Sequence, residues 1–367
     1  MASATISAGV LADTPVESEY SDILNNTDGD GTSSNPYVVT TLDELQAVQG
    51  NLSAEYILGN NINASETDIW NSGAGFTPIG NLSNTFLGNF YGQGFSVDGL
   101  YIHRPNTDYV GLFGRVNSSD IKNIGVTNLD IQGADSVGGL VGLSIGSNIT
   151  NSYASGVVSG DYSVGGLVGL NKNTTIEKSY SNSNVSGDES VGGLAGYNRD
   201  SSNITESYSN SSVTGDYYVG GLLGYNVGSS NIKKSYSSGS VSGNSDVGGL
   251  LGYNANYESY RVTDSYWNTE TSNQSTSAGS AIGLTTAEMT GSAAETNMVN
   301  LDFTSVWRTV SASDADSSAD SYPILASVDS VIVSESSSEE YGGMSTLVSV
   351  ALFFLIFIMV VLLLVKD

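Results

Sequence analysis

The sequence predicts an all-β fold, a three-sided parallel β-helix with about 27–28 residues per coil. Three observations predict it: a motif that returns at a fixed period, short segments divided by turn residues, and no apolar spacing of helical type within the repeat. Each coil of such a solenoid buries little surface alone and is stabilised by its neighbours.

The period is set by the tetrapeptide VGGL, with a degenerate copy, VGLFG, that begins at Val110. VGGL begins at Val137, Val164, Val191, Val219 and Val247, in steps of 27, 27, 28 and 28 residues. Helical repeats need amphipathic helices that are missing here, and WD40 or kelch units are longer, at about 40–50 residues. At 27–28 residues per coil, the region from Tyr37 to Asn268 would hold about eight coils, and a strand spacing of about 4.8 Å would make it about 40 Å tall.

Other residues keep the same period and indicate which side chains face the interior. We expect the leucines of VGGL to stack inside: Leu140, Leu167, Leu194, Leu222 and Leu250. Asparagines recur at Asn171, Asn198, Asn226 and Asn254. In the Ile-x-x-Ser-Tyr segment, strict alternation puts Ile204, Glu206 and Tyr208 on one face, so a bulge or bend must intervene.

Charged and aromatic columns follow from that bend. Lys178, Glu206 and Lys234 alternate in sign on successive coils and predict an exposed charge ladder. We therefore expect an outward aromatic stripe that could stack on sugar rings, made of Tyr153, Tyr180, Tyr208 and Tyr236. The alternatives are an interior tyrosine stack and plain packing along the solenoid.

The chain divides into six predicted segments. They are a leader at 1–34, a capping helix with irregular first coils at 35–109, the repeats at 110–268, a C-terminal cap at 269–326, an acidic Ser-rich stalk at 327–343 and a membrane anchor at 344–366. Thr41 and Glu44 form a capping-box pattern and predict a short helix across the open end of the solenoid. AEYILGNNI is expected as the first strand, LTTAEMTG as a short helix, and FTSVWRTV and SYPILASV as late strands that close the other end.

The segment Ser345–Val365 has 21 residues and no charge, which predicts a transmembrane helix. Lys366 follows it, so the positive-inside tendency places the bulk of the chain outside the cell. Residues 1–13 show no signal peptide, and we expect the signal to be missing from this sequence. The alternative is a tail-anchored protein whose bulk stays in the cytoplasm.

Composition restricts the partners and the chemistry. The net charge is −27 with only 11 Lys and Arg. The basic surface that nucleic-acid-binding proteins use to contact phosphates is therefore absent, and we expect no nucleic-acid partner. The absence of Cys excludes disulfides and Cys-bound metals. The acidic excess suits high salt and favours a halophilic source.

Few residues carry candidate chemistry. His103 is the single histidine and is expected to pack beside Arg104 and Pro105 at a coil edge. Asp28 and Asp30 resemble the start of a calcium loop but lack its later ligands, and a turn is the preferred interpretation. An acidic turn column is expected before each VGGL, with structural cations as its possible occupants, at Asp135, Asp161, Asp188, Asp216 and Asn244. We expect no cofactor.

Sequons for N-glycosylation are numerous, and we expect about half to be used if the chain is exported. They lie at Asn25, Asn51, Asn63, Asn81, Asn117, Asn148, Asn173, Asn184, Asn203, Asn210 and Asn273.

From Gly29 to Leu325 the sequence resembles GLUG-motif surface proteins of prokaryotes. The resemblance rests on VGGLVG followed by I-x-x-S-Y and V-S-G, on the head GDGTSSNPYVVTTLDELQAVQG, and on the tail DSYWNTETSNQ with SYPIL. It implies a right-handed β-helix on a secreted or surface-anchored protein, often an adhesin, with relatives in bacteria and in halophilic or methanogenic archaea. It supplies no catalytic residues.

The sequence thus predicts a membrane-anchored extracellular solenoid that acts in adhesion or as a structural surface protein. Its expected partners are the membrane through Ser345–Val365, and surface glycans, proteins or copies of itself. One alternative is the envelope spike of an archaeal virus. A second is a β-helix enzyme that degrades polysaccharides, which would need carboxylates converging with a basic residue; here the basic residues are scattered, and we expect no enzyme.

The acidic turn column gives a first testable prediction. Carboxylates stacked at about 4.8 Å repel one another by roughly 1 kcal/mol per pair in water, and salt screens this repulsion. Molar salt or a divalent cation is therefore expected to raise the melting temperature. Thermal unfolding at low and molar salt measures the shift, and an unchanged melting temperature would contradict the prediction.

Overall fold

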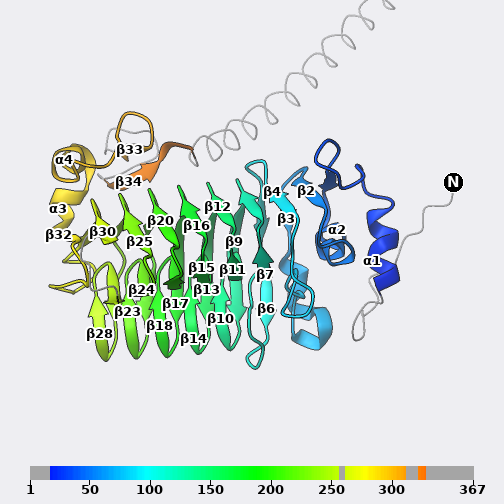
Figure 1. Cartoon of the computed structure of the whole chain (residues 1–367), viewed down its shortest axis with the longest axis horizontal. Coiled ribbons are helices and arrows are strands. Elements are labelled where there is room, and N and C mark those ends of the chain that lie inside the picture. The colour runs from blue at the N-terminus through cyan, green and yellow to red at the C-terminus, as the bar shows by residue number, and fades with distance from the viewer. Residues whose placement is uncertain (1–16, 256–260, 311–320, 328–367) are drawn as a thin grey trace, which may run out of the picture.

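The computed structural model describes residues 17–255, 261–310 and 321–327, and its body is a parallel β-solenoid of about six turns (Figure 1). About eight coils were expected. The count differs because the N-terminal laps contribute strands to only two of the sheets, so they are not complete turns.

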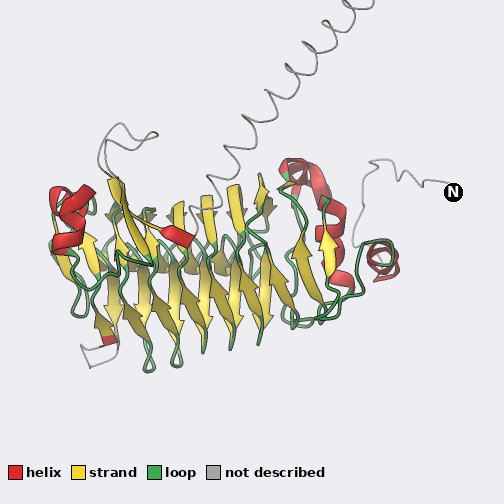
Figure 2. Ribbon diagram, turned by 90° about the horizontal axis from the view of Figure 1, so that it is seen from above, coloured by secondary structure: helices red, strands yellow, loops and turns green. Residues whose placement is uncertain are grey.

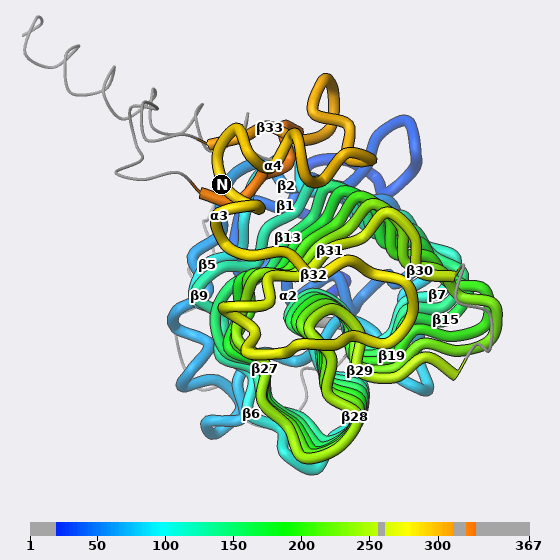
Figure 3. Tube along the Cα trace, turned by 90° about the vertical axis from the view of Figure 1, so that its left-hand side faces the viewer, coloured from blue at the N-terminus to red at the C-terminus, as the bar shows by residue number. Residues whose placement is uncertain are grey.

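Each turn contributes four strands rather than three. One turn consists of β12 (Asn148–Thr150), β13 (Tyr153–Ser159), β14 (Tyr162–Gly165) and β15 (Val168–Lys172). The Gly-rich VGGL stretch, which a three-sided coil would make a single side, forms two strands, β14 and β15, separated by Gly166 and Leu167. Figure 3, which looks along the solenoid, shows the successive turns superimposed.

The four sheets are named here after their repeating residues. The Ile sheet orders β1 (Tyr37–Val39), β2 (Glu55–Leu58), β4 (Asn89–Tyr91), β8 (Asp120–Lys122), β12, β16 (Thr175–Glu177), β20 (Asn203–Thr205), β25 (Asn231–Lys233) and β30 (Val262–Thr263). The Tyr sheet orders β3 (Ile62–Asn63), β5 (Ser96–Asp98), β9 (Gly125–Gln132), β13, β17 (Tyr180–Ser186), β21 (Tyr208–Ser209), β26 (Tyr236–Ser237), β31 (Tyr266–Asn268) and β32 (Ile282–Leu284), with β6 (Tyr101–His103), β22 (Ser212–Thr214) and β27 (Val241–Ser242) beside this path.

The other two sheets are formed by the Gly-rich stretch. The Val sheet orders β10 (Asp135–Gly138), β14, β18 (Glu189–Gly192), β23 (Tyr217–Gly220) and β28 (Ser245–Gly248). The Asn sheet orders β7 (Phe113–Asn117), β11 (Val141–Ile145), β15, β19 (Ala195–Arg199), β24 (Leu223–Asn226) and β29 (Leu251–Asn254). The first strand is β1, ahead of the expected β2, and pairs with it in parallel.

The register places like residues on like residues. Val164 pairs with Val191, which pairs with Val219, so each VGGL lies on the next. The expected leucine column is confirmed, because all five VGGL leucines are fully buried: Leu140, Leu167, Leu194, Leu222 and Leu250. Burial of these stacked aliphatic side chains supplies the main favourable free energy of the fold.

The glycines of the Asn sheet permit one sheet to lie directly on another. A Cβ at Gly196 would lie 2.4 Å from the carbonyl carbon of Ser163 and 2.5 Å from the amide nitrogen of Val164. Both atoms belong to the Val-sheet strand β14, one turn earlier. The recurring glycine is therefore required because main chain packs on main chain.

The bend expected between Ile and Tyr is confirmed: at each corner between the Ile sheet and the Tyr sheet, one residue adopts the left-handed backbone conformation. The φ angles are 49° at Lys178, 48° at Glu206 and 49° at Lys234. The serine that follows each of them is fully buried. The hydroxyl of this serine bonds the backbone groups that have no partner in the strand ladder at the corner.

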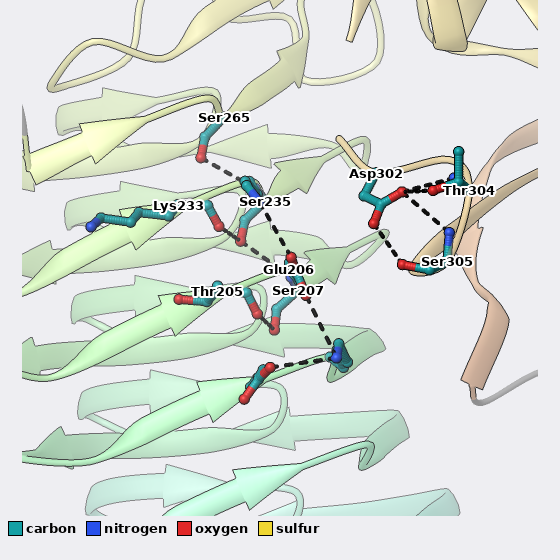
Figure 4. Close-up of polar contacts among 12 residues, drawn as sticks. Thr205, Glu206, Ser207, Lys233, Ser235, Ser265, Asp302, Thr304 and Ser305 are labelled. Carbon is teal, nitrogen blue, oxygen red and sulfur yellow. Dashed lines mark hydrogen bonds and ion pairs between the residues drawn. The ribbon is translucent and has the colours of Figure 1, made fainter. Parts of the chain in front are cut away.

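This serine ladder links the turns through hydroxyl groups (Figure 4). The Ser179 N–H donates to Ser207 Oγ at 3.2 Å, and the Ser207 N–H donates to Ser235 Oγ at 3.2 Å. The Ser207 hydroxyl itself donates to the carbonyl of Thr205 at 2.8 Å. The Ser of the Ser-Tyr motif therefore satisfies backbone groups on two turns at once.

A second polar ladder runs through the interior of the Asn sheet. The side-chain amide of Asn171 donates to Asn198 Oδ1 at 2.7 Å, Asn198 donates to Asn226 at 3.1 Å, and Asn226 donates to Asn254 at 3.2 Å. A buried amide can be tolerated here because its partner repeats in every turn.

The N-terminal end is closed by helices (Figure 2). The expected capping helix is α2 (Leu42–Ala47), whose capping box joins Thr41 and Glu44, and a 3₁₀ turn, η1 (Val48–Gly50), follows it. An extended leader was expected over 1–34, but α1 (Glu17–Leu24) lies there and packs against α2 and η1. Leu24 is buried in the main core, so part of the predicted leader belongs to the cap. A further 3₁₀ segment, η2 (Ser65–Gly73), lies among the first laps.

The C-terminal cap covers an end and also a flank. The expected short helix is α3 (Thr286–Met289), and α4 (Gly291–Asn297) follows it. The late strands β33 (Trp307–Val310) and β34 (Ser321–Leu325) form an antiparallel pair. They do not close the end as expected, because the pair folds back along the side of the solenoid (Figure 1). There Trp307 contacts the rings of Tyr208 and Tyr236 on the outside of the Tyr sheet.

Several predictions fall outside the described residues. These are the first part of the leader, most of the stalk at 327–343, and the anchor Ser345–Val365. Within the described ranges, no helix combines the length and the hydropathy needed to cross a bilayer.

Replacement of Ser207 by alanine is expected to destabilise the solenoid. The change removes the acceptor of the buried Ser179 N–H, and an unsatisfied buried donor costs about 1–3 kcal/mol. Ser186→Ala, at an exposed strand position, is the matched control. Urea unfolding followed by circular dichroism measures both variants, and equal midpoints would contradict the assigned role of the hydroxyl.

Replacement of Trp307 by alanine is expected to loosen the flank and leave the turns folded. Trp307 is 1% exposed, and truncation of a buried Trp costs about 3–5 kcal/mol. Hydrogen exchange should accelerate in β33 and β34 before it does in β12–β29. Trp70→Ala, at the opposite end, should leave exchange in β33 unchanged. Exchange that rises equally in all strands of Trp307→Ala would show that the flank is not a separate unit.

Candidate functional site

The predicted aromatic stripe is a stacked column on the outer side of the Tyr sheet. Ring centroids of Tyr153 and Tyr180 lie 5.0 Å apart, those of Tyr180 and Tyr208 4.8 Å, and those of Tyr208 and Tyr236 5.1 Å, with interplanar angles of 1°, 5° and 3°. This Tyr ladder belongs to a hydrophobic cluster separate from the main core. The interior alternative is therefore wrong.

The chain itself covers much of the Tyr ladder. Tyr208 is 5% exposed and Tyr236 is fully buried beneath Trp307, whereas Tyr153 and Tyr180 are half-buried. Burial raises the pKa of Tyr208 and Tyr236 well above 10.0, so both stay neutral at physiological pH. Among the four rings, Tyr153 and Tyr180 keep part of their surface exposed within the described structure. The sequence did not reveal that the C-terminal strands pack over Tyr208 and Tyr236.

The charge ladder beside these rings is confirmed. Lys178 Nζ lies 3.8 Å from a Glu206 carboxylate oxygen, and Lys234 Nζ lies 3.6 Å from the other. Glu206 thus bridges cations on the two neighbouring turns. Such partly exposed pairs contribute little stability, about 0–1 kcal/mol each, and chiefly fix which turn lies on which.

The acidic turn column is exposed and is partly corrected. The amide of Asp188 donates to the carbonyl of Asp161, and the amide of Asp216 donates to that of Asp188, so these residues are stacked. Asn244 follows and donates through Nδ2 to Asp216 Oδ1 at 2.6 Å. Asp135 does not belong to this column, because Ala134 occupies the equivalent place and Asp135 pairs with Tyr162.

The remaining polar candidates lie at turns and edges. Asp30 Oδ1 accepts hydrogen bonds from the Thr32 amide at 3.0 Å and the Thr32 hydroxyl at 2.7 Å, and Asp28 is exposed nearby. His103 is exposed and stacks on Tyr101 at 6.3 Å. Among the described residues, no group of three or more His, Cys, Asp or Glu side chains could hold a metal ion.

All eleven sequon asparagines lie at or near the surface. Eight are exposed, namely Asn25, Asn51, Asn63, Asn81, Asn148, Asn173, Asn184 and Asn273. Three are half-buried, namely Asn117, Asn203 and Asn210. Asn210 also accepts a hydrogen bond from the hydroxyl of Ser238, which ties down its amide.

Sequence reasoning missed a second tyrosine group on the outer face of the Asn and Val sheets. We call it the outer Tyr cluster: Tyr197, Tyr218, Tyr225 and Tyr253. Three of its members are in register on β19, β24 and β29. The signal was present as the tripeptide Gly-Tyr-Asn, which ends each of these VGGL stretches just before the buried asparagine.

The rings of the outer Tyr cluster lie close together but are not parallel. Centroids of Tyr197 and Tyr225 are 4.9 Å apart at 88°, and those of Tyr225 and Tyr253 are 5.3 Å apart at 28°. Tyr218 lies 5.0 Å from Tyr225 and 5.2 Å from Tyr253. The Arg199 guanidinium lies 6.0 Å from the Tyr197 ring centroid. Burial raises the pKa of Tyr225, with smaller contributions from the neighbouring tyrosines and, last, from the carboxylate of Glu189.

Comparison with known proteins identifies the repeat. The model of the GLUG motif matches residues 133–159 and 215–242. Halomucin of Haloquadratum walsbyi is 34% identical over 144 residues, which cover 36% of this chain and 2% of halomucin. A protein of Evansella cellulosilytica described as a Gly-rich membrane protein is 32% identical over 124 residues, which cover 33% of this chain and 14% of that protein. The chain thus spans a small part of either relative.

A solved structure supports the architecture. The crystal structure of a Bacteroides ovatus protein described as an immunoglobulin A1 protease superimposes with a TM-score of 0.61 at 20% identity, over 81% of this chain and 94% of that one. At this identity the likeness shows the fold alone. The chain carries the GLUG motif on a parallel β-solenoid fold and is similar over part of its length to halomucin and to a Gly-rich membrane protein.

Proposed function

We propose that this protein is an exported, membrane-anchored solenoid that acts in adhesion or as a structural element of the cell surface, without catalysis. The anchor is the apolar segment Ser345–Val365, and the solenoid stands on the extracellular face. The parallel β-helix of the solenoid is right-handed, in keeping with the general preference of connections between parallel strands.

The observation that carries this proposal is the regular column structure of the outer faces. Parallel ladders run through every turn, so the solenoid is held as one stiff body. Its side chains repeat at the strand spacing and present the same chemistry several times over. Repetition of this kind favours multivalent contact with extended partners, whereas an active site needs one unique constellation of groups.

The partners follow from charge and from the relatives. The net charge of −27 disfavours nucleic acid and suits a high-salt surrounding, where screening weakens repulsion between the exposed acids. Surface glycans, proteins and further copies of the chain remain the partner classes, and the exposed sequons are available for glycosylation after export. A relative described as a membrane protein is in keeping with this location.

External proteolysis of intact cells that carry the tagged full chain tests the location. The solenoid should be cleaved without lysis, and deletion of 345–365 should move it from the membrane fraction into the medium. Cells that carry the full chain should also attach or aggregate more than cells that carry the deletion. A solenoid protected from external protease would contradict the proposal and favour the cytoplasmic tail-anchored topology.

A further inference from the structure

The outer Tyr cluster places partly exposed rings beside hydrogen-bonding side chains on three successive turns. Tyr253 is 38% exposed, and Tyr197, Tyr218 and Tyr225 are half-buried. Three turns span about 10 Å at the strand spacing. The Tyr ladder on the other flank is different, since its near-parallel rings are packed beneath the chain's own Trp307.

The backbone brings a fourth ring to the cluster. Tyr218 has a φ of +54°, in the left-handed region. Every turn of the repeat has a positive φ at this corner, with small or polar residues at Ser136, Ser163, Ser190 and Asp246 and an aromatic residue at Tyr109. A bulky aromatic residue is strained in this conformation. Here it carries a fourth ring to within about 5 Å of Tyr225 and Tyr253.

The polar groups at the cluster define the ligand chemistry. Glu189 pairs in register with Tyr217, next to Tyr218, and its charge acts on both Tyr197 and Tyr225. Arg199 lies over Tyr197 and forms an ion pair with Asp200, with Nε and Oδ2 3.1 Å apart. Tyrosine offers an apolar ring with a polar tip, which suits a pyranose ring that has one C–H face and a rim of hydroxyls. A carboxylate and a guanidinium can accept and donate to such hydroxyls.

Charge disfavours two competing classes of ligand. The nearby Glu189 and the overall charge of −27 oppose the binding of uronate, sulfate and sialate groups and of an anionic lipid surface. We propose that the outer Tyr cluster binds a neutral polysaccharide, whose sugar rings pack on the exposed surface of the cluster at Tyr253 while Glu189 and Arg199 hold the hydroxyls. This inference rests on the proposed adhesive function and names its ligand class.

Affinity electrophoresis of the detergent-solubilised full chain tests the inference, with dextran, yeast mannan and mixed-linkage β-glucan as neutral probes and alginate as the acidic one. At least one neutral probe should retard the chain, and alginate should not. The variant Tyr225→Ala/Tyr253→Ala should bind that probe about tenfold or more weakly, as expected for truncation of aromatic anchors. Tyr225→Phe should keep most of the binding because it keeps the ring.

Tyr91→Ala is the matched control, since Tyr91 is half-buried on β4 of the Ile sheet, in an N-terminal lap away from the cluster. Circular dichroism verifies that each variant is folded. Failure of all three neutral probes to retard the chain, or equal loss in Tyr91→Ala, would overturn the inference. So would sedimentation that shows a dimer dispersed by the double variant, because the cluster would then be a self-interface. Surface location and cell attachment without glycan binding would refute this inference and leave the proposed function standing.

Discussion

The structure depends on one constraint: each turn must lie on the next with like residues in contact. The chain bends through a left-handed residue such as Glu206, and the backbone groups at that bend are completed by a hydroxyl from the following turn. A turn that slipped by one residue would lose this hydroxyl and would also move its Ile, Leu and Asn columns out of the core. The same buried ladders that hold the interior therefore also fix which side chains appear outside, including both groups of tyrosines.

The parallel solenoid could be predicted because its signal is repeated. One VGGL stretch alone would be ambiguous, but several at a near-constant period require stacking, and the leucine column and the capping box at Thr41 followed directly. The position of the extra residue in the 28-residue turns could not be predicted. The structure places it between the Asn and Ile sheets, where Asp200 and Ser201 both adopt positive φ and the preceding turn has Asn173 alone.

The prediction was weakest where a single, unrepeated segment meets the repeats. The outward direction of the Tyr ladder follows from alternation and a bend, yet nothing periodic indicates that Trp307 will lie on Tyr236. That contact joins residues 71 positions apart and depends on the path of a cap that occurs once. The outer Tyr cluster was missed for a different reason. Three of its tyrosines follow glycine in a stretch that forms two strands where a three-sided coil has one side, so the direction of each side chain could not be predicted.

The last described residue has a consequence for how the molecule transmits load. The Ser327 hydroxyl lies 3.1 Å from Asn151 Oδ1, beside an early turn and far from the final strand β32. Whatever follows residue 327 is thus joined to the side of the rod at mid-height. A pull on the chain beyond residue 327 would first separate the β33–β34 hairpin from the Tyr ladder and would reach the turns only afterwards. Force would therefore enter the solenoid from its flank and across the strands, and the hairpin would detach before the parallel ladders are loaded.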